Sequence, residues 1–293
     1  MKKESKIGWI GTGIMGTAMA SNLLKNGFSV NAYNRTTEKT KELESKGAKV
    51  LLSPSALRDA SDIIFLMLTN DKACESVFTE KEGLLDGYIG EGKVIVNCST
   101  ISPAISVKLG NLAKENGFQY LDGPVSGSAG AAREGSLLFL VGGDKDIFER
   151  ITPILDAMGK KNYYLGAVSQ GNKAKLAINY LVAIDYLAIG ETIHFAESMN
   201  VHPDDMMDII NNSGVGNVTS RIKTDPIVTG DYSNIAFALD NMLKDLKLAK
   251  DAGNNVPLSN TVLDTYLDAS KAGYGNKDVM EVLTYLRKDY KPS

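Results

Sequence analysis

Three glycines near the start of the chain have the spacing of a phosphate-binding turn. A short apolar run, Lys6–Ile10, is typical of a strand, and a helical pattern follows the glycines over residues 15–26. In such a turn the first glycine permits a tight bend, the second lets the backbone approach a pyrophosphate, and the third allows close helix packing. The helix N-terminus adds unpaired N–H groups and a partial positive charge. This context predicts a dinucleotide site formed by Gly11, Thr12, Gly13, Ile14, Met15 and Gly16.

The residues after the second predicted strand distinguish between the two nicotinamide dinucleotides. The run Ser29–Tyr33 is followed by Asn34, Arg35 and Thr36. An NAD site usually has Asp or Glu at this point, to accept hydrogen bonds from the ribose 2′-OH. A carboxylate would repel a 2′-phosphate, whereas a guanidinium and a hydroxyl would bind one. We therefore expect NADP(H), with a solvated turn residue as the alternative interpretation of Arg35.

A third segment, Ser126-Gly127-Ser128, has the composition of an anion-binding loop. It comes shortly after a predicted strand and consists of small residues. Exposed N–H groups at the carboxyl end of a strand can surround an anionic group of a substrate. An ordinary Gly/Pro/Ser turn has the same composition, so the segment alone leaves both readings open.

Lys175 and Asn179 could supply acid–base chemistry from a long apolar helix. They are four residues apart and so share one face of it. Lys173 projects about 200° away around the helix, so both lysines cannot point in one direction. Polar groups in a buried helix are costly without polar partners, although a lysine near a helix end can also reach solvent. Lys244 and Asp245, on a later helix, are by spacing alone compatible with surface charges.

The elements that must position these residues alternate up to about residue 165. This alternation predicts a doubly wound parallel sheet with helices on both faces, because parallel strands need crossover connections. We expect helices over residues 15–26, 37–46 and 102–116, and strands over 6–10, 29–33, 63–68, 94–97, 119–122 and 137–141.

Beyond residue 171 the pattern becomes helical throughout. One long helical segment covers residues 172–199, and its apolar residues lie on more than one face, which predicts a buried helix. We expect an NADP-binding Rossmann domain over residues 1–167 and an all-helical substrate and dimerisation domain over 168–293. The apolar helix would form the core of the second domain, a subunit interface, or both, in a homodimer or homotetramer.

Composition excludes several other classes of protein. The 293 residues carry a net charge of −3 without a basic stripe, so we expect no nucleic-acid partner. We find no apolar stretch of about 18 residues and no signal-peptide cleavage pattern, so we expect neither a membrane span nor secretion. Cys74 and Cys98 lack metal-ligand spacing, which predicts reduced thiols, no metal site and a cytoplasmic location.

Taken together, these segments resemble the β-hydroxyacid dehydrogenase family, which includes 3-hydroxyisobutyrate dehydrogenase, tartronate semialdehyde reductase and the glyoxylate/succinic semialdehyde reductases. The resemblance covers essentially the whole chain. It rests on several motifs in order: residues 7–16, Asn97-Cys98-Ser99-Thr100, residues 123–127, Lys175-x3-Asn179 and Lys244-Asp245.

The resemblance implies reduction of a small carboxylate-bearing aldehyde by NADPH, or the reverse oxidation of the hydroxyacid. Lys175 would act as the general acid, and an ammonium there would also stabilise the developing alkoxide. Asn179 would orient the substrate or that lysine. The remaining implied contacts are Ser126, Gly127, Ser128, Phe237 and Asp245 for the substrate, and Leu68, Thr69, Thr100 and Lys244 for the cofactor.

The sequence departs from the family pattern in ways that leave the substrate open. Ser126-Gly127-Ser128 is similar to the semialdehyde and glyoxylate reductases, whereas residues 129–132 are similar to the hydroxyisobutyrate branch. Ile178 stands where relatives often carry a second amide. An imine reductase is an alternative, but those enzymes generally lack the lysine that Lys175 matches. A non-catalytic dehydrogenase-like binding module would also have replaced it, and would carry an added partner-binding region.

Overall fold

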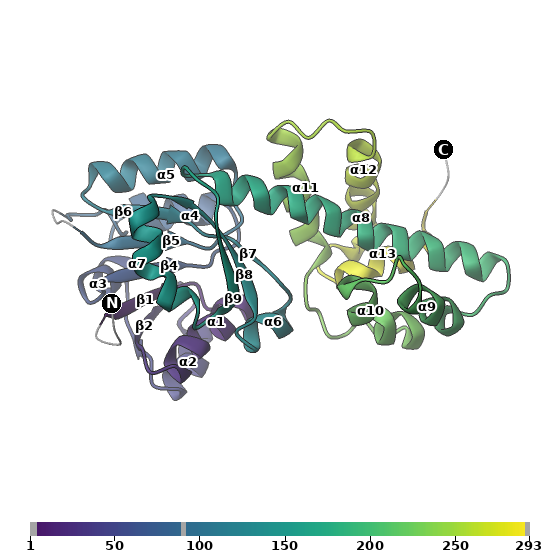
Figure 1. Ribbon diagram of the computed structural model, residues 1–293, viewed down its shortest axis with the longest axis horizontal. Helices are drawn as coiled ribbons and strands as arrows, with labels where there is room; N and C mark the ends of the chain where they lie inside the picture. The colour runs from purple at the N-terminus through teal and green to yellow at the C-terminus, as the bar shows by residue number, and fades with distance from the viewer. Residues whose placement is uncertain (1–4, 89–91, 291–293) are drawn as a thin grey trace. The chain divides into compact units, whose positions relative to one another are not determined.

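A computed structural model describes residues 5–88 and 92–290, and the chain divides into two compact units, Met1–Lys175 and Leu176–Ser293 (Figure 1). The division falls inside one continuous helix, α8 (Gln170–Ser198). The boundary predicted at residues 167 and 168 lies just before that helix begins. The first turns of α8 therefore pack with the first unit.

The first unit is built on one twisted sheet. The strands run in the order β3-β2-β1-β4-β5-β6-β8-β7, and β9 also pairs with β8. All six predicted strands are present, and β1 to β6 are mutually parallel, as a doubly wound fold requires. The strands are β1 (Lys6–Ile10), β2 (Ser29–Tyr33), β3 (Lys49–Val50), β4 (Ile63–Leu66), β5 (Val94–Asn97), β6 (Gln119–Asp122), β7 (Val125–Ser126), β8 (Leu137–Gly143) and β9 (Gly159–Tyr164).

One edge of the sheet adds strands that are not parallel to the rest. Strand β8 runs antiparallel to both β6 and β7. Only a short helix separates β7 from β8, so the chain turns back without the long crossover that a parallel connection needs. Strand β9 was not predicted. It begins Gly-Lys-Lys-Asn and so lacks the apolar run that would have indicated a strand.

Helices cover both faces of this sheet (Figure 1). Helices α1 and α5 match the predicted segments within one residue at each end, whereas residues 37–46 form a 3-10 turn followed by a short helix. Polar side chains cap the first turns of five helices, at Ser53, Asn70, Ser102, Ser128 and Asp144. The helical elements are α1 (Ile14–Lys25), η1 (Thr37–Thr40), α2 (Lys41–Ser45), α3 (Pro54–Asp59), α4 (Asp71–Thr79), α5 (Pro103–Glu115), α6 (Ala129–Arg133) and α7 (Lys145–Leu155).

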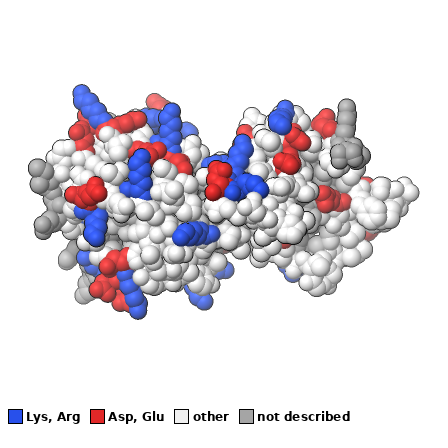
Figure 2. Space-filling view, turned by 90° about the horizontal axis from the view of Figure 1, so that it is seen from above, with Lys and Arg blue, Asp and Glu red and all other residues white. Residues whose placement is uncertain are grey.

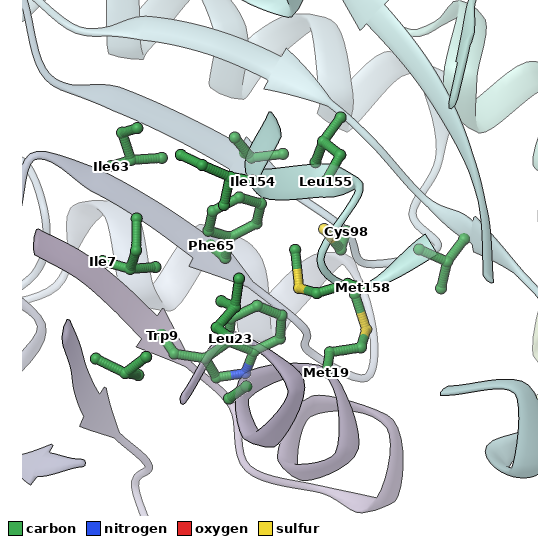
Figure 3. Close-up of a cluster of buried hydrophobic side chains, with 14 of the residues drawn as sticks. Ile7, Trp9, Met19, Leu23, Ile63, Phe65, Cys98, Ile154, Leu155 and Met158 are labelled. Carbon is green, nitrogen blue, oxygen red and sulfur yellow. The ribbon is translucent and has the colours of Figure 1, made fainter. Parts of the chain in front are cut away.

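Trp9 belongs to one of the two cores of this unit (Figure 3). Its ring is fully buried and stacks on Phe65 with the ring centroids 5.4 Å apart. Its Nε1 donates a hydrogen bond of 3.0 Å to the carbonyl of Gly11. The core therefore holds the first glycine of the phosphate-binding turn in place.

The second unit is all-helical, as predicted. Its core joins residues of α8, among them Ala183, Leu187 and Ile193, to residues of the later helices. The elements after α8 are α9 (Pro203–Asn212), α10 (Val218–Thr229), α11 (Leu239–Asp251), α12 (Ser259–Ala269), the π-helical turn η2 (Ser270–Tyr274), η3 (Val279–Glu281) and α13 (Val282–Lys288).

Helix α8 differs from expectation in two respects. It was predicted to be buried nearly all round, but Leu181 is 51% exposed and Phe195 is 64% exposed. By length and composition it could also cross a membrane, contrary to the expectation that no segment would qualify. Its buried face supplies the core of the second unit, which accounts for its apolar composition without a membrane.

Candidate functional site

The three glycines of the turn have different structural constraints. Gly11 has φ of +97°, and a Cβ there would collide with the carbonyl oxygen of Met67. A Cβ on Gly16 would collide with the carbonyl oxygen of Gly11. By contrast, a Cβ on Gly13 would meet nothing within 4 Å. The fold itself thus requires Gly11 and Gly16, whereas Gly13 leaves open space beside the backbone, as a bound pyrophosphate would need.

The start of α1 has polar groups available for an anion. Gly13 is the N-cap, and no side chain caps the first turn. The hydroxyl of Thr12 is buried and has no hydrogen-bond partner among the described residues, which is unusual for a buried polar group. A phosphate at this helix N-terminus would satisfy both the exposed N–H groups and this hydroxyl. The residues present therefore fit the pyrophosphate of a dinucleotide.

Asn34 and Arg35 have separate roles in the loop after β2. The side chain of Asn34 accepts a hydrogen bond from Thr12 N at 3.1 Å and donates one to Thr36 O at 2.9 Å. Asn34 therefore joins the glycine turn to its own loop. Arg35 is exposed and makes no hydrogen bond or ion pair within residues 5–88 and 92–290, which leaves its guanidinium available to a ligand.

The sequence interpretation missed Lys39 as a candidate for this site. Lys39 lies on η1, where its N–H donates to Thr36 O at 3.0 Å. Together with Thr12, Gly13 and Arg133 it lines a hollow of about 1010 Å³. A second cation only four residues after Arg35 is a signal that could have been found in the sequence, and the hydrogen bond to Thr36 O brings the Lys39 backbone beside the loop.

Side chains bind the loops at the carboxyl edge of the sheet to one another. Ser99 Oγ accepts a hydrogen bond from Leu68 N at 2.8 Å, and Asp71 Oδ1 accepts one from Ser102 N at 2.9 Å. Thr100, which is half-buried, lies between these attachment points, whereas Thr69 is exposed. The loops after β4 and β5 therefore form one connected layer that includes three of the predicted cofactor contacts.

Asp122, at the end of β6, fixes the beginning of α8. Its two carboxylate oxygens accept hydrogen bonds from Ser169 N at 2.7 Å and from Asn172 N at 2.8 Å. Burial raises the pKa of this carboxyl, and the hydrogen bonds from Asn172 and Ser169 oppose that rise. The position at a helix N-terminus also favours the negative charge. Asp122 thus caps α8, although it lies far from the helix in the sequence.

Lys175 lies one turn further along α8. It is half-buried, whereas Lys173 is exposed. This difference agrees with the expectation that the two lysines point in different directions.

The Ser126-Gly127-Ser128 segment lies between β7 and α6. Gly127 is exposed and has φ of +144°, a conformation that favours glycine. Ser128 Oγ accepts a hydrogen bond from Ala131 N at 3.2 Å and so caps α6. Because a hydroxyl can donate as well as accept, Ser128 retains a hydrogen for another group.

In the second unit, Asn179, Lys244 and Asp245 form a connected group. Asn179 Nδ2 donates to Asp245 Oδ2 at 2.5 Å, and both side chains are buried. Lys244 Nζ lies 2.9 Å from Asp245 Oδ1 and forms an ion pair with it. The Asp245 carboxylate therefore holds the amide of Asn179 and the ammonium of Lys244, so it positions two predicted site residues.

Phe237 precedes α11 in a loop held by a buried ion pair that the sequence interpretation missed. Lys223 Nζ lies 2.6 Å from Asp278 Oδ1, with the side chains only 4% and 1% exposed. The other carboxylate oxygen accepts a hydrogen bond from Ala236 N at 3.2 Å, and Val279 N donates to Phe237 O at 2.8 Å. The two partners are 55 residues apart, so no local spacing could have revealed the pair.

The glycine turn after β1 and the parallel strands of the sheet are those of a dinucleotide-binding domain. The family model described as the NAD binding domain of 6-phosphogluconate dehydrogenase matches residues 6–166. A second model, described as NAD-binding of NADP-dependent 3-hydroxyisobutyrate dehydrogenase, matches residues 169–286.

The chain is 34% identical to 2-(hydroxymethyl)glutarate dehydrogenase of Eubacterium barkeri, over 97% of this chain and 95% of the relative. It is also 34% identical to glyoxylate/succinic semialdehyde reductase 1 of Arabidopsis thaliana, over 95% of this chain and 97% of the relative. The solved 3-hydroxyisobutyrate dehydrogenase of Mycobacterium tuberculosis matches with a TM-score of 0.85 and 27% identity, covering 97% of this chain and 99% of that one. The chain belongs to the β-hydroxyacid dehydrogenase family, and it is an oxidoreductase that acts on CH–OH donors.

Proposed function

We propose that this enzyme uses NADP(H) to interconvert a small carboxylate-bearing aldehyde and its hydroxyacid, with Lys175 as the acid–base residue. The observation that carries the cofactor choice is the loop after β2, where Asn34-Arg35-Thr36 replaces the acidic residue of a typical NAD site. Arg35 and Lys39 would bind the 2′-phosphate. The description of the second family model as NADP-dependent supports the same choice.

The names of the relatives support the substrate class. One is named for 2-(hydroxymethyl)glutarate and another for glyoxylate and succinic semialdehyde, all of which pair a carboxylate with an alcohol or aldehyde. The N–H groups and hydroxyls of Ser126, Gly127 and Ser128 would hold that carboxylate. These names favour an aldehyde reductase over an imine reductase.

Bound NADPH would supply the hydride. In the direction of reduction, the Lys175 ammonium would donate its proton to the carbonyl oxygen, where negative charge develops. Asn179 would orient the substrate, with Asp245 holding its amide in one direction. Thr100 and Lys244 would contact the nicotinamide end of the cofactor, and Phe237 would contact the substrate.

The decisive experiment measures NADPH oxidation with glyoxylate, succinic semialdehyde, tartronate semialdehyde, methylmalonate semialdehyde and sulfolactaldehyde. We expect turnover of at least one substrate by the wild type and a loss of about 100-fold or more in Lys175→Ala. Lys173→Ala, which removes the exposed lysine of the same turn, is the matched control and should keep wild-type activity. Equal rates in Lys175→Ala and wild type would refute the assigned role.

The cofactor preference has its own test. Arg35→Ala should weaken binding of NADPH by about 10-fold or more, because a charge-assisted contact to the 2′-phosphate is lost, and should leave NADH binding unchanged. An unchanged ratio of the two affinities would refute the proposed 2′-phosphate site.

The subunit arrangement is a further part of the proposal. Leu181 and Phe195 expose apolar surface on α8, and a homodimer or homotetramer would bury such surface. Light scattering of the purified protein should give the mass of a dimer or tetramer, and a monomer would count against this proposal.

A further inference from the structure

Asn172 connects two loops of the first unit to the helix that carries Lys175. Its side chain is fully buried. Asn172 Oδ1 accepts a hydrogen bond from Ile101 N at 3.0 Å, and its backbone N–H donates to Asp122 Oδ2 at 2.8 Å. Its Nδ2 lies 3.5 Å from the same carboxylate oxygen. One residue thus joins the loop after β5, the end of β6 and the first turn of α8.

The residues that Asn172 connects lie next to two predicted site residues, Thr100 and Lys175. Ile101 directly follows Thr100, and Lys175 follows Asn172 by three residues, less than one helical turn. Within residues 5–88 and 92–290, the Asn172 oxygen is the only acceptor of Ile101 N, so loss of the amide would leave a buried N–H without a partner. Ser169, in the preceding turn, has φ of +80°, a conformation that needs support from its surroundings.

We propose that Asn172 is a positioning residue that fixes Thr100 relative to the first turn of α8, and so relative to Lys175, and that Asp122 holds Asn172 in place. This inference rests on the proposed function, which gives Thr100 and Lys175 their roles. A displacement of about 1 Å between groups that act on one reaction can slow the chemical step by about 100-fold. Substrate and cofactor would still bind, because the proposed contacts to them do not include Asn172, whose hydrogen bonds are made to Ile101 and Asp122.

The test compares Asn172→Ala with Asn31→Ala. Asn31 is a buried asparagine of β2 whose Nδ2 donates to Ala60 O at 2.9 Å and to Ser61 Oγ at 3.0 Å, so its loss is a comparable structural defect without a link to α8. For Asn172→Ala we expect kcat to fall at least 10-fold, with the Kd of NADPH within about 3-fold of wild type. Asn31→Ala should keep kcat.

Hydrogen exchange and a double-mutant cycle complete the test. Exchange at the Ile101 amide should be faster in Asn172→Ala and unchanged in Asn31→Ala. In Asp122→Asn, an NH₂ group replaces one oxygen that now accepts hydrogen bonds, so kcat should also fall. If the two residues act as a unit, the double variant will lose about as much kcat as the worse single variant rather than the product of both losses.

The outcomes separate the two hypotheses. Wild-type kcat in Asn172→Ala, or an equal fall in Asn31→Ala, would overturn the positioning role and leave the proposed function intact. Multiplicative losses in the double variant would overturn the part assigned to Asp122. A wild-type enzyme that reduces none of the five aldehydes would overturn the proposed function itself.

Discussion

Gly13 separates what the fold requires from what a bound dinucleotide requires. Its backbone angles, φ of −75° and ψ of −172°, are accessible to any residue, and a Cβ there would meet nothing within 4 Å. We therefore expect Gly13→Ala to fold normally, with a free energy of unfolding within about 1 kcal/mol of wild type, because the freedom lost by the unfolded chain offsets the poorer fit of alanine to the N-cap of α1. The new methyl would occupy the space assigned to the pyrophosphate, so the Kd of NADPH should rise at least 10-fold, or about 1.4 kcal/mol.

Trp9 makes the stability half of this experiment direct. It is the single tryptophan of the chain, it is fully buried, and it is hydrogen-bonded to Gly11. Its fluorescence in a denaturant titration therefore reports unfolding of the unit that contains the turn, and calorimetric titration gives the Kd. Wild-type affinity for NADPH in Gly13→Ala would refute the placement of the pyrophosphate beside Gly13, because the new methyl would hinder only a pyrophosphate bound there.

Gly16→Ala is the opposite control. A Cβ there would collide with the carbonyl oxygen of Gly11, which is backbone and cannot move without shifting the turn. Overpacking of this kind typically costs about 1–3 kcal/mol, so Gly16→Ala should lose stability and affinity together. If Gly13→Ala and Gly16→Ala had the same free energy of unfolding, the open space beside Gly13 would not explain a difference between the two glycines.

Three further predictions concern buried groups. Lys223→Met should lower the free energy of unfolding by about 3–5 kcal/mol, because the Asp278 carboxylate would remain buried without its cation; a loss below about 1 kcal/mol in urea titration would contradict this. Cys74 and Cys98 should resist a thiol reagent until the protein unfolds, because both are buried and burial raises the pKa of the Cys98 thiol; rapid labelling of the native protein would disagree. Burial raises the pKa of the Asp185 carboxyl in the folded protein above its ordinary value of 3.8. The folded protein therefore loses stability as pH rises from 3.8 through this raised pKa, because the folded state holds the proton more tightly than the unfolded chain does. Asp185→Asn should therefore be more stable than wild type at pH 7, and this difference in stability should become smaller below pH 3.8. Thermal unfolding of both proteins at the two pH values measures it, and a difference that does not change with pH would contradict the prediction.

The sequence was most informative where periodicity and local motifs coincide. Strands such as Ile63–Leu66 and Val94–Asn97 are short apolar runs that are buried on both faces. The glycine turn lies directly after another short apolar strand, Lys6–Ile10. Strand β9 was not predicted, because the Lys-Lys-Asn run near its start, which suits an exposed edge strand, breaks the apolar pattern. The exposed face of α8 was not predicted, because composition shows how apolar a helix is but not how many of its faces other elements cover.

The polar contacts that hold the site residues could not be predicted, since each joins positions far apart in the chain. Asp122 reaches Asn172 across 50 residues, and Asn179 reaches Asp245 across 66. A lone Asp or Asn in the sequence gives no sign of whether it will contact a ligand or hold another residue. The structure shows what each one holds: Asp122 binds the N–H of Asn172, three residues before Lys175, and Asp245 binds the amide of Asn179, itself a predicted site residue.

The two units use the same physical device for this purpose. In the first, the Asn172 amide accepts a hydrogen bond from Ile101 N, next to Thr100. In the second, the Asp278 carboxylate accepts one from Ala236 N, next to Phe237. Each loop is fixed by a buried acceptor whose own remaining bonds are made within the protein. Such acceptors have little capacity left for a ligand. Under the proposed function, discrimination between one carboxylate-bearing aldehyde and another would therefore come from groups that can still bind, such as the Ser128 hydroxyl.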